Sequence, residues 1–381
     1  WKMIRKQFPL KEGQTYFNNG TMGPTSGYAL DQMIHHMMHY NKEAATIDYK
    51  NGSGPELLSG YFAYEELRKK LADIINCDFK EISLIQNATF GMNYVGMGLE
   101  LKAGDELLNT NQEHGGGFGA WQTLAKRKGC VYKQAKMPVP ANDPQEIFDA
   151  VFKEVTSKTR VIAIPHIVSV YGTVMPVKAI CAEARKRGIF TVLDGAQCVG
   201  QIKVDVKDIG CDAYYSSLHK WLLAPAGSGL LYINEGVSPT IWTTIASYQW
   251  DKQEDHGCRL MQNGTGNAAL MTGYEAAVDF FNTIGQEKWL ARIKELGSYL
   301  RAGLKEFPHV TIESSTNEEM AAGITTYNVA GISGPGLQKT MWEKERLQPR
   351  SVGEKNMRHS VHIYNSKEEI DRALGVIKDL G

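Results

Sequence analysis

The sequence predicts an α/β protein, in which a large domain with a mostly parallel, doubly wound sheet precedes a smaller α+β domain. Strand-like and helix-like stretches alternate from about residue 60 to residue 235, which is the pattern of repeated βαβ units. A chain of 381 residues is also too long for one simple core. After a long amphipathic stretch at 289–304, the pattern changes to short strands and a closing helix.

The helices of the large domain are marked by apolar residues that recur every three or four positions. Gly129 and Gly188 stand where two of these periodic stretches stop, as glycine commonly does after a helix. A polar turn at 86–88 precedes another stretch and indicates its start. The periodicity predicts helices at 67–75, 89–99, 118–128 and 177–187.

Continuous apolar runs between these helices predict strands that are buried on both faces of the sheet. Shorter runs predict further strands in the smaller domain, before a closing helix at 368–380. Trp121 is expected in the core of the large domain. The strands are expected at 161–164, 189–194, 213–216, 230–233, 310–312 and 323–327.

We expect three parts along the chain. Residues 1–20 form an N-terminal segment that packs with the small domain, 21–265 form the large domain, and 266–381 form the small one. Segment 331–357 is rich in glycine and charge, which predicts a mobile connection near a site. Loops near Tyr40, Trp250 and this segment are expected to form pocket walls.

Composition excludes several classes of function. Lys and Arg equal Asp and Glu in number, so nothing favours nucleic acid or an anionic membrane surface as a partner. No apolar run is long enough for a spanning helix. His35 and His39 share a helix face without a nearby carboxylate, which predicts a solvated face and no metal site.

The six cysteines are scattered without a Cys-x-x-Cys pair, which favours free thiols and a reducing compartment. We therefore expect a cytoplasmic protein. The chain begins at Trp1, so export is the alternative if a leader was removed.

An aspartate and a lysine follow two of the predicted strands. Asp194 closes the apolar run at 189–193, and Lys220 lies just beyond the strand at 213–216. In a doubly wound sheet, sites form at the carboxyl ends of the strands. A lysine that carries pyridoxal phosphate (PLP) as a Schiff base, and a carboxylate that pairs with its pyridinium nitrogen, are what a PLP site requires. The sequence therefore predicts PLP as the cofactor.

Seven polar motifs along the chain then identify a family. In their order, they resemble those of fold-type I PLP enzymes of the class V aminotransferase group, which holds cysteine desulfurases and isopenicillin N epimerase. The resemblance covers nearly the whole chain. The motifs are Tyr16-Phe17-Asn18-Asn19-Gly20, Asn87-Ala88-Thr89, Glu113-His114, Asp194-Gly195-Ala196-Gln197, Ser217-Leu218-His219-Lys220, Gly264-Thr265-Gly266-Asn267 and Arg358-His359-Ser360-Val361-His362-Ile363-Tyr364-Asn365.

The resemblance implies how these residues hold the cofactor. Asp194 pairs with the ring nitrogen, Gln197 contacts the phenolic oxygen, and His114 stacks on the ring. Ser169 stands where many relatives place an asparagine near the phenolic oxygen, and serine is shorter. The segment with Thr265 is lent to the phosphate of the partner subunit, which implies a homodimer with a shared active site. The implied cofactor contacts are Lys220, Asp194, Gln197, Ala88, Thr89, His114, Ser217, His219, Thr265 and Ser169.

The chemistry explains these residue types. The PLP phosphate is a dianion, which suits backbone N–H groups at a helix start and nearby hydroxyls. Lys220, once released by substrate, is the natural base for the α-proton, and Asp194 and His114 complete the expected catalytic set. Arg358 can bind a substrate carboxylate through two parallel hydrogen bonds, and Asn19 is the other expected substrate contact.

The reaction type stays open at this point. The motifs favour an isopenicillin N epimerase-like epimerase or racemase acting at the Cα of an amino acid. A C–S or other β-lyase of a cysteine-type substrate is the alternative, followed by an aminotransferase. A binding subunit that has lost catalysis is a further class. Cysteine desulfurases carry a nucleophilic cysteine shortly before the carboxylate-binding arginine. No cysteine follows Cys258 here, which disfavours that activity.

Overall fold

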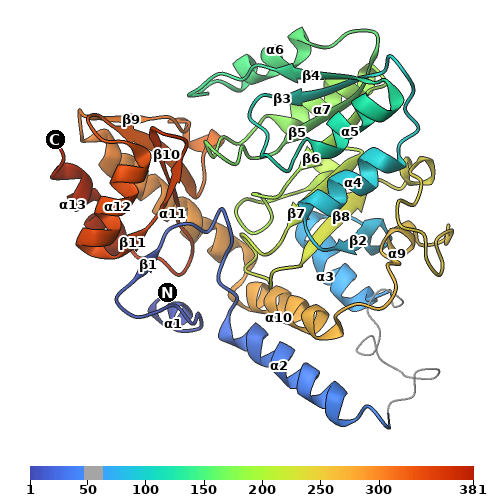
Figure 1. Cartoon of the computed structure of the whole chain (residues 1–381), viewed down its shortest axis with the longest axis horizontal. Coiled ribbons are helices and arrows are strands. Elements are labelled where there is room, and N and C mark those ends of the chain that lie inside the picture. The colour runs from blue at the N-terminus through green and yellow to red at the C-terminus, as the bar shows by residue number, and fades with distance from the viewer. Residues whose placement is uncertain (47–62) are drawn as a thin grey trace.

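The computed structural model describes residues 1–46 and 63–381. In these residues, seven strands form a sheet in the order β2-β8-β7-β6-β5-β3-β4 (Figure 1). Strand β8 is antiparallel to both neighbours and the other pairs are parallel, as expected for a mostly parallel sheet. The strands are β2 (Ile82–Ile85), β3 (Glu106–Thr110), β4 (Val131–Ala135), β5 (Thr159–Pro165), β6 (Phe190–Asp194), β7 (Ala213–Ser217) and β8 (Gly229–Ile233).

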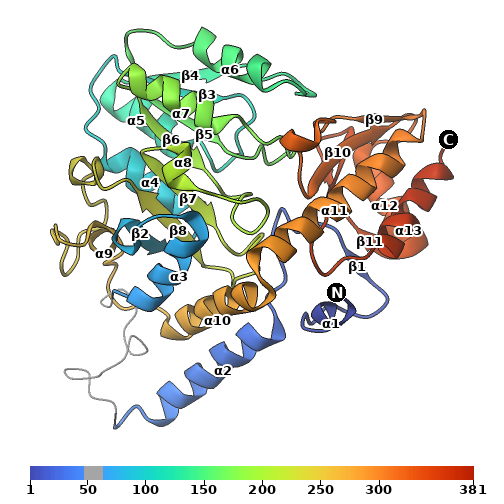
Figure 2. The ribbon, with the colours of Figure 1, turned by 180° about the vertical axis from the view of Figure 1, so that it is seen from behind.

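Helices cover both faces of this sheet (Figures 1 and 2), because alternate side chains along a strand point to opposite faces. On β5, Ile162 and Ile164 pack in a core with α3, α6, α7 and α10. Val161 and Ala163 pack on the other face with α4 and α5, where Trp121 is fully buried as predicted. The helices of this part are α3 (Glu65–Ile75), α4 (Ala88–Gly98), α5 (Gly119–Lys128), α6 (Pro144–Lys153), α7 (Val177–Lys186), α8 (Val206–Ile209), α9 (His256–Leu260) and α10 (Ala268–Ile284).

The C-terminal part contains a smaller antiparallel sheet. Within the described ranges, four strands form it in the order β12-β13-β10-β9, and its helices pack over a separate apolar core. Together with the larger sheet, this confirms the predicted fold class. The elements are β9 (Val310–Ile312), β10 (Ile324–Val329), β12 (Arg350–Val352) and β13 (Asn356–Ser360), with helices α11 (Gln286–Lys305), α12 (Gly334–Glu345) and α13 (Lys367–Lys378).

The N-terminal segment connects the two parts. After α1 (Lys2–Arg5), strand β1 (Thr15–Tyr16) pairs in parallel with β11 (Leu347–Gln348) beside the small sheet. Helix α2 (Gly27–Lys42) then packs along α10 at the base of the large part (Figure 1). The domain limits proposed from the sequence, 1–20, 21–265 and 266–381, stay a prediction.

The prediction of a mobile connection at 331–357 was wrong, because this segment contains α12, β11, β12 and the start of β13. Gly334 and Gly336 lie in the first turn of α12, which Ser333 caps by accepting a hydrogen bond from the Gly336 amide. Leu337 and Met341 anchor that helix in the small core. Gly353 has a φ of 60° in the turn between β12 and β13, where glycine is favoured.

Among the described residues, no helix is both long and apolar enough to cross a bilayer.

Candidate active site

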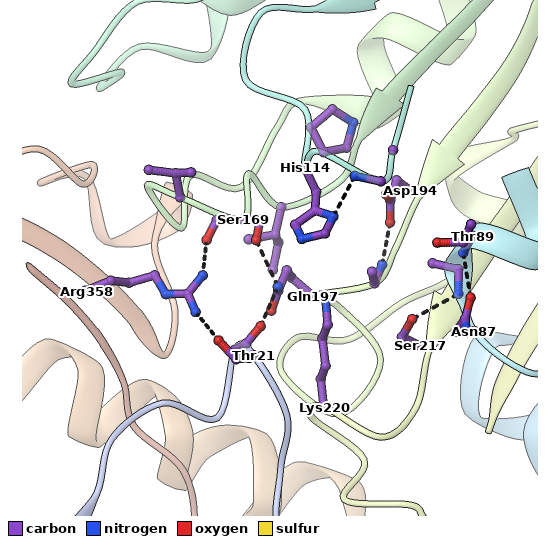
Figure 3. A pocket seen from close by; sticks show the side chains of 18 of the residues that line it. Thr21, Asn87, Thr89, His114, Ser169, Asp194, Gln197, Ser217, Lys220 and Arg358 are labelled. Atoms are coloured by element: carbon purple, nitrogen blue, oxygen red, sulfur yellow. Dashed lines mark hydrogen bonds between the residues drawn. The ribbon is translucent and has the colours of Figure 1, made fainter. Parts of the chain in front are cut away.

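A cavity of about 400 Å³ lies where three strands of the large sheet end (Figure 3). Pro165, Asp194 and Ser217 line it from the carboxyl ends of β5, β6 and β7. Arg350 and Arg358 line it from β12 and β13 of the small sheet. The cavity therefore lies between the two parts of the molecule, at the edge of the sheet that the sequence predicts.

Asp194, the last residue of β6, and Lys220, which follows β7, line the same cavity. Burial raises the pKa of Asp194. Two neighbours oppose this shift: the Ala196 amide, which donates a hydrogen bond to Oδ1 at 2.8 Å, and the charge of Lys220. Burial lowers the pKa of Lys220 to about 8, and Asp194 opposes this shift. The amine is therefore neutral more often near physiological pH than that of an exposed lysine.

Gln197 is held in one orientation by its neighbours. Its amide oxygen accepts a hydrogen bond from the indole nitrogen of Trp221 at 2.7 Å. Its amide nitrogen consequently points the other way and donates to the Gly20 carbonyl at 2.8 Å and to the Ser169 hydroxyl at 3.1 Å. The structure thus brings Gln197 and Ser169 together on the cavity wall, as their predicted shared role requires.

The turn before α4 forms one end of the cavity. Asn87 caps the helix by accepting a hydrogen bond from the Thr89 amide at 3.0 Å. The Ala88 amide donates to the Ser217 hydroxyl oxygen at 2.9 Å, which leaves the hydroxyl hydrogen of Ser217 available to an anion. His219 also lines this cavity, and its buried Nδ1 has no hydrogen-bond partner among the described residues.

His114 lies on the turn after β3 and faces the same cavity (Figure 3). Its Nδ1 accepts a hydrogen bond from the Gly116 amide at 3.1 Å, so the ring hydrogen of the neutral form lies on Nε2. Burial and the charge of Lys220 lower the pKa of His114, which favours this neutral form. The preceding Glu113 anchors the turn, since its Oε1 accepts hydrogen bonds from the amide and hydroxyl of Thr110.

The opposite end of the cavity is formed by arginines. Arg358 is buried and donates to the Ser169 carbonyl at 2.8 Å, to Asn18 Oδ1 at 3.1 Å and to Thr21 Oγ1 at 2.9 Å. Arg350 donates to the same Thr21 oxygen at 2.7 Å. Burial lowers the pKa of Arg358 to about 10, and the charge of Arg350 adds to this shift. This end of the cavity is consequently strongly positive.

Comparison with known proteins identifies the family. Residues 16–373 match the family described as Aminotransferase class-V. The chain belongs to the class V aminotransferase family. It is 29% identical to isopenicillin N epimerase of Streptomyces clavuligerus, over 98% of this chain and 96% of that protein. It is 27% identical to a probable cysteine desulfurase of Pyrococcus abyssi, over 99% of this chain and 96% of that protein.

Solved structures show the same relationship. A complex between the cystine C–S lyase C-DES and its reaction product cysteine persulfide superimposes with a TM-score of 0.88 at 25% identity. That match covers 98% of this chain and 100% of the C-DES chain. A C-DES variant with glycine covalently linked to its PLP cofactor has a TM-score of 0.87 at 25% identity, covering 99% of each chain. The predicted family is confirmed, and this class V enzyme uses PLP.

The residues around the cavity fit PLP. Asp194 provides a buried carboxylate for a protonated ring nitrogen, and Lys220 provides an amine in the same cavity. The hydroxyls of Thr89 and Ser217 provide donors for a phosphate at the start of α4, and His219 lines the same cavity. The donors for phosphate and Arg358 lie at opposite ends of the cavity (Figure 3).

Two predicted site residues lie outside this cavity in the class V enzyme. Asn19 is fully buried behind it, where its side chain donates to the Lys220 carbonyl at 3.1 Å and accepts from the Tyr364 hydroxyl. Thr265 lines another cavity with Tyr40 and residues of α2. A direct contact of Asn19 with substrate, and of Thr265 with the phosphate of a partner, stay predictions.

The sequence did not identify Thr21 or Arg350 as site residues. Thr21 directly follows the motif ending at Gly20, so its position in the chain was the only available signal. Arg350 lies in the segment that was expected to be mobile, where an arginine has no defined direction. Trp250, expected near a pocket wall, lies on the surface and does not line this cavity in the described residues.

Proposed function

We propose that this enzyme is an epimerase or racemase that acts at the Cα of an amino acid. The observation that carries the proposal is that two groups able to transfer protons, Lys220 and His114, line one cavity from different turns of the chain. Inversion at Cα requires removal of a proton from one face and its return to the other. The 29% identity with isopenicillin N epimerase over nearly the full length supports the same reaction class.

Each residue has a defined task in this proposal. PLP, when bound, draws electron density away from the bonds of the substrate Cα. Lys220 takes the α-proton, and its desolvated amine is neutral often enough to do so. His114 returns the proton from Nε2 in its protonated imidazolium form, which requires Nδ1 to release the Gly116 amide and carry a hydrogen itself. Asp194 holds a proton on the ring nitrogen, and Arg358 orients the substrate through its carboxylate.

A C–S lyase is the second candidate, and the likeness to the cystine C–S lyase favours it. Lys220 would begin both reactions by taking the α-proton, so the cavity residues serve either one. Cysteine desulfurase is not proposed, because residues 259–381 contain no cysteine to carry a persulfide. The described residues that line the cavity also contain none.

The deciding experiment is proton NMR of the PLP-loaded enzyme with L- and D-amino acids in D2O, sulfur-containing ones included. We expect the α-proton signal to disappear while both enantiomers form and no fragments appear. Pyruvate or another keto acid released with ammonia and a thiol would instead indicate a lyase. A keto acid without ammonia would indicate aminotransfer, and an unchanged α-proton for every amino acid would contradict both candidates.

Replacing Arg358 with alanine should chiefly weaken binding of the amino acid. The guanidinium is the buried cation at the substrate end, and its Nε–H, which has no partner among the described residues, is a donor for a carboxylate. We expect KM to rise about 100-fold, from the loss of charge-assisted hydrogen bonds, with a smaller change in kcat. Steady-state kinetics check this result. Arg358→Lys is the second variant, because it keeps the positive charge but lacks the planar set of guanidinium donors. An unchanged KM would show that another group holds the carboxylate.

We further infer that the active enzyme is a homodimer in a reducing compartment such as the cytoplasm. Thr265 is exposed and outside the Lys220 cavity of its own chain, as a residue lent to a partner must be. Exposed large apolar side chains of α2 and of residues 242–250 offer a surface for such a partner. All six cysteines are free, which is usual where thiols stay reduced.

A further inference from the structure

Two arginines stand side by side on the small sheet. Arg350 of β12 and Arg358 of β13 are direct partners in the antiparallel register, so their side chains leave the same face of the sheet. Both of them line the cavity that holds Lys220. Like charges placed directly opposite each other destabilise a sheet. Such a pair therefore needs an explanation beyond the fold.

Nothing in the described residues neutralises this pair. Both guanidinium groups donate to one oxygen, Thr21 Oγ1, at 2.7 and 2.9 Å. The Thr21 hydroxyl in turn donates to Asn18 Oδ1 at 2.7 Å, so the bridge between the arginines is neutral. Among residues 1–46 and 63–381, no carboxylate forms a salt bridge with either arginine. Two cations linked by one hydroxyl form a site for anions.

The cofactor phosphate cannot be the anion for this pair. The donors for phosphate lie at the start of α4, around Thr89 and Ser217. Thr21 and Arg358 lie at the other end of the cavity (Figure 3). Arg350 contacts Thr21 and belongs to that end. Whatever anions the arginines bind must therefore come with the substrate.

The positions of the arginines differ in depth. Arg358 is buried, whereas Arg350 is exposed on an edge strand of the sheet, next to Val352 and Gly353, which also line the cavity. We propose that the substrate is an amino acid with a second anionic group, whose α-carboxylate binds Arg358 and whose side-chain anion binds Arg350. This inference rests on the proposed action at the Cα of an amino acid. A carboxylate is a side-chain group that the paired donors of a guanidinium suit, and a sulfonate presents oxygens of the same negative charge.

The alternative arrangement is a single α-carboxylate held by both arginines. In that case, loss of Arg350 weakens the binding of every amino acid to the same extent. In our proposal, loss of Arg350 weakens the binding only of amino acids that have an anionic side chain. Pairs of amino acids that differ by one charge separate the two arrangements, because their α-carboxylates are identical.

The test is Arg350→Gln in the PLP-loaded enzyme. Dissociation constants are measured by calorimetry with α-methyl amino acids, which have no α-proton to lose, and KM is measured with the ordinary ones. The probes are L-glutamate and L-2-aminoadipate against L-glutamine and L-norleucine, with L-cysteate against L-aspartate to distinguish sulfonate from carboxylate. We expect about 10- to 100-fold weaker binding of the acidic probes and little change for the neutral ones.

Two further variants make the result specific. Lys355→Gln removes a positive charge from the exposed turn of the same hairpin, outside the cavity, and should leave all probes unchanged. Arg350→Lys should recover part of the affinity for acidic probes. Equal weakening of acidic and neutral probes by Arg350→Gln would overturn the proposal, as would a wild-type enzyme without preference for acidic probes. Exchange of the α-proton by the wild-type enzyme is a separate readout. Its absence would contradict the proposed function at Cα, whereas the anion site is tested by the binding measurements.

Discussion

Lys220→Ala is expected to lower turnover at least about 10⁴-fold, because it removes both the amine that links the cofactor and the proposed base. The protein should remain folded. The main-chain carbonyl of Lys220 accepts a hydrogen bond from the side-chain amide of Asn19, and an alanine at this position keeps that bond. The lost side chain only enlarges a cavity that already exists. Rates of α-proton exchange and the melting temperature of the loaded variant check both parts.

A chemical readout distinguishes this role from a structural one. Reduction with borohydride followed by mass spectrometry should find PLP attached to the wild-type chain at residue 220, and no attachment in Lys220→Ala. Lys186→Ala, at a side chain 75% exposed on α7, is the matched control and should behave as the wild type. Retained turnover in Lys220→Ala would remove the central claim about the site.

Asp194→Asn is expected to reduce kcat by about 10²- to 10⁴-fold while preserving the fold. Asparagine has the same shape and still accepts the hydrogen bond from the Ala196 amide. It carries no negative charge, however, so it cannot keep a proton on the ring nitrogen of the cofactor. The loss should therefore lie in the chemical step more than in the binding of the amino acid.

The measurements for this variant are kcat, KM and the dissociation constant of PLP. Asp208→Asn replaces a carboxylate that is 56% exposed and serves as the matched control. A kcat equal to that of the wild type would show that the charge of Asp194 is not needed for the reaction.

Much of the large domain could be predicted because its strands are buried on both faces. Such strands are continuous apolar runs, so the run at 161–164 located β5, observed at Thr159–Pro165. The antiparallel direction of β8 could not be predicted, since an apolar run does not show whether a strand lies parallel or antiparallel to its neighbours. Asp194 and Lys220 followed from the ends of their strands, whereas the other cavity residues of the large domain followed from the resemblance to the family.

The substrate end of the cavity was harder to predict because tertiary contacts create it. Arg350 points into the cavity only because β12 pairs with β13, and a three-residue edge strand has no clear apolar alternation. The composition of 331–357 indicated flexibility, yet a serine cap and two buried side chains make its first half a helix. Asn19 belongs to a motif that was recognised, but a motif does not show burial, and the side chain is fully buried outside the cavity lining.

The hydrogen bond between Arg358 and Asn18 joins residues that are 340 positions apart in the chain. During synthesis on the ribosome, which proceeds from the N-terminus, the strands and turns that hold the cofactor emerge well before the arginines do. A nascent chain can therefore assemble its cofactor end first. Asn18 and Arg358 can meet only after Arg358 has emerged, so the capacity to select an amino acid arises later in the enzyme's own production than the site that holds the cofactor.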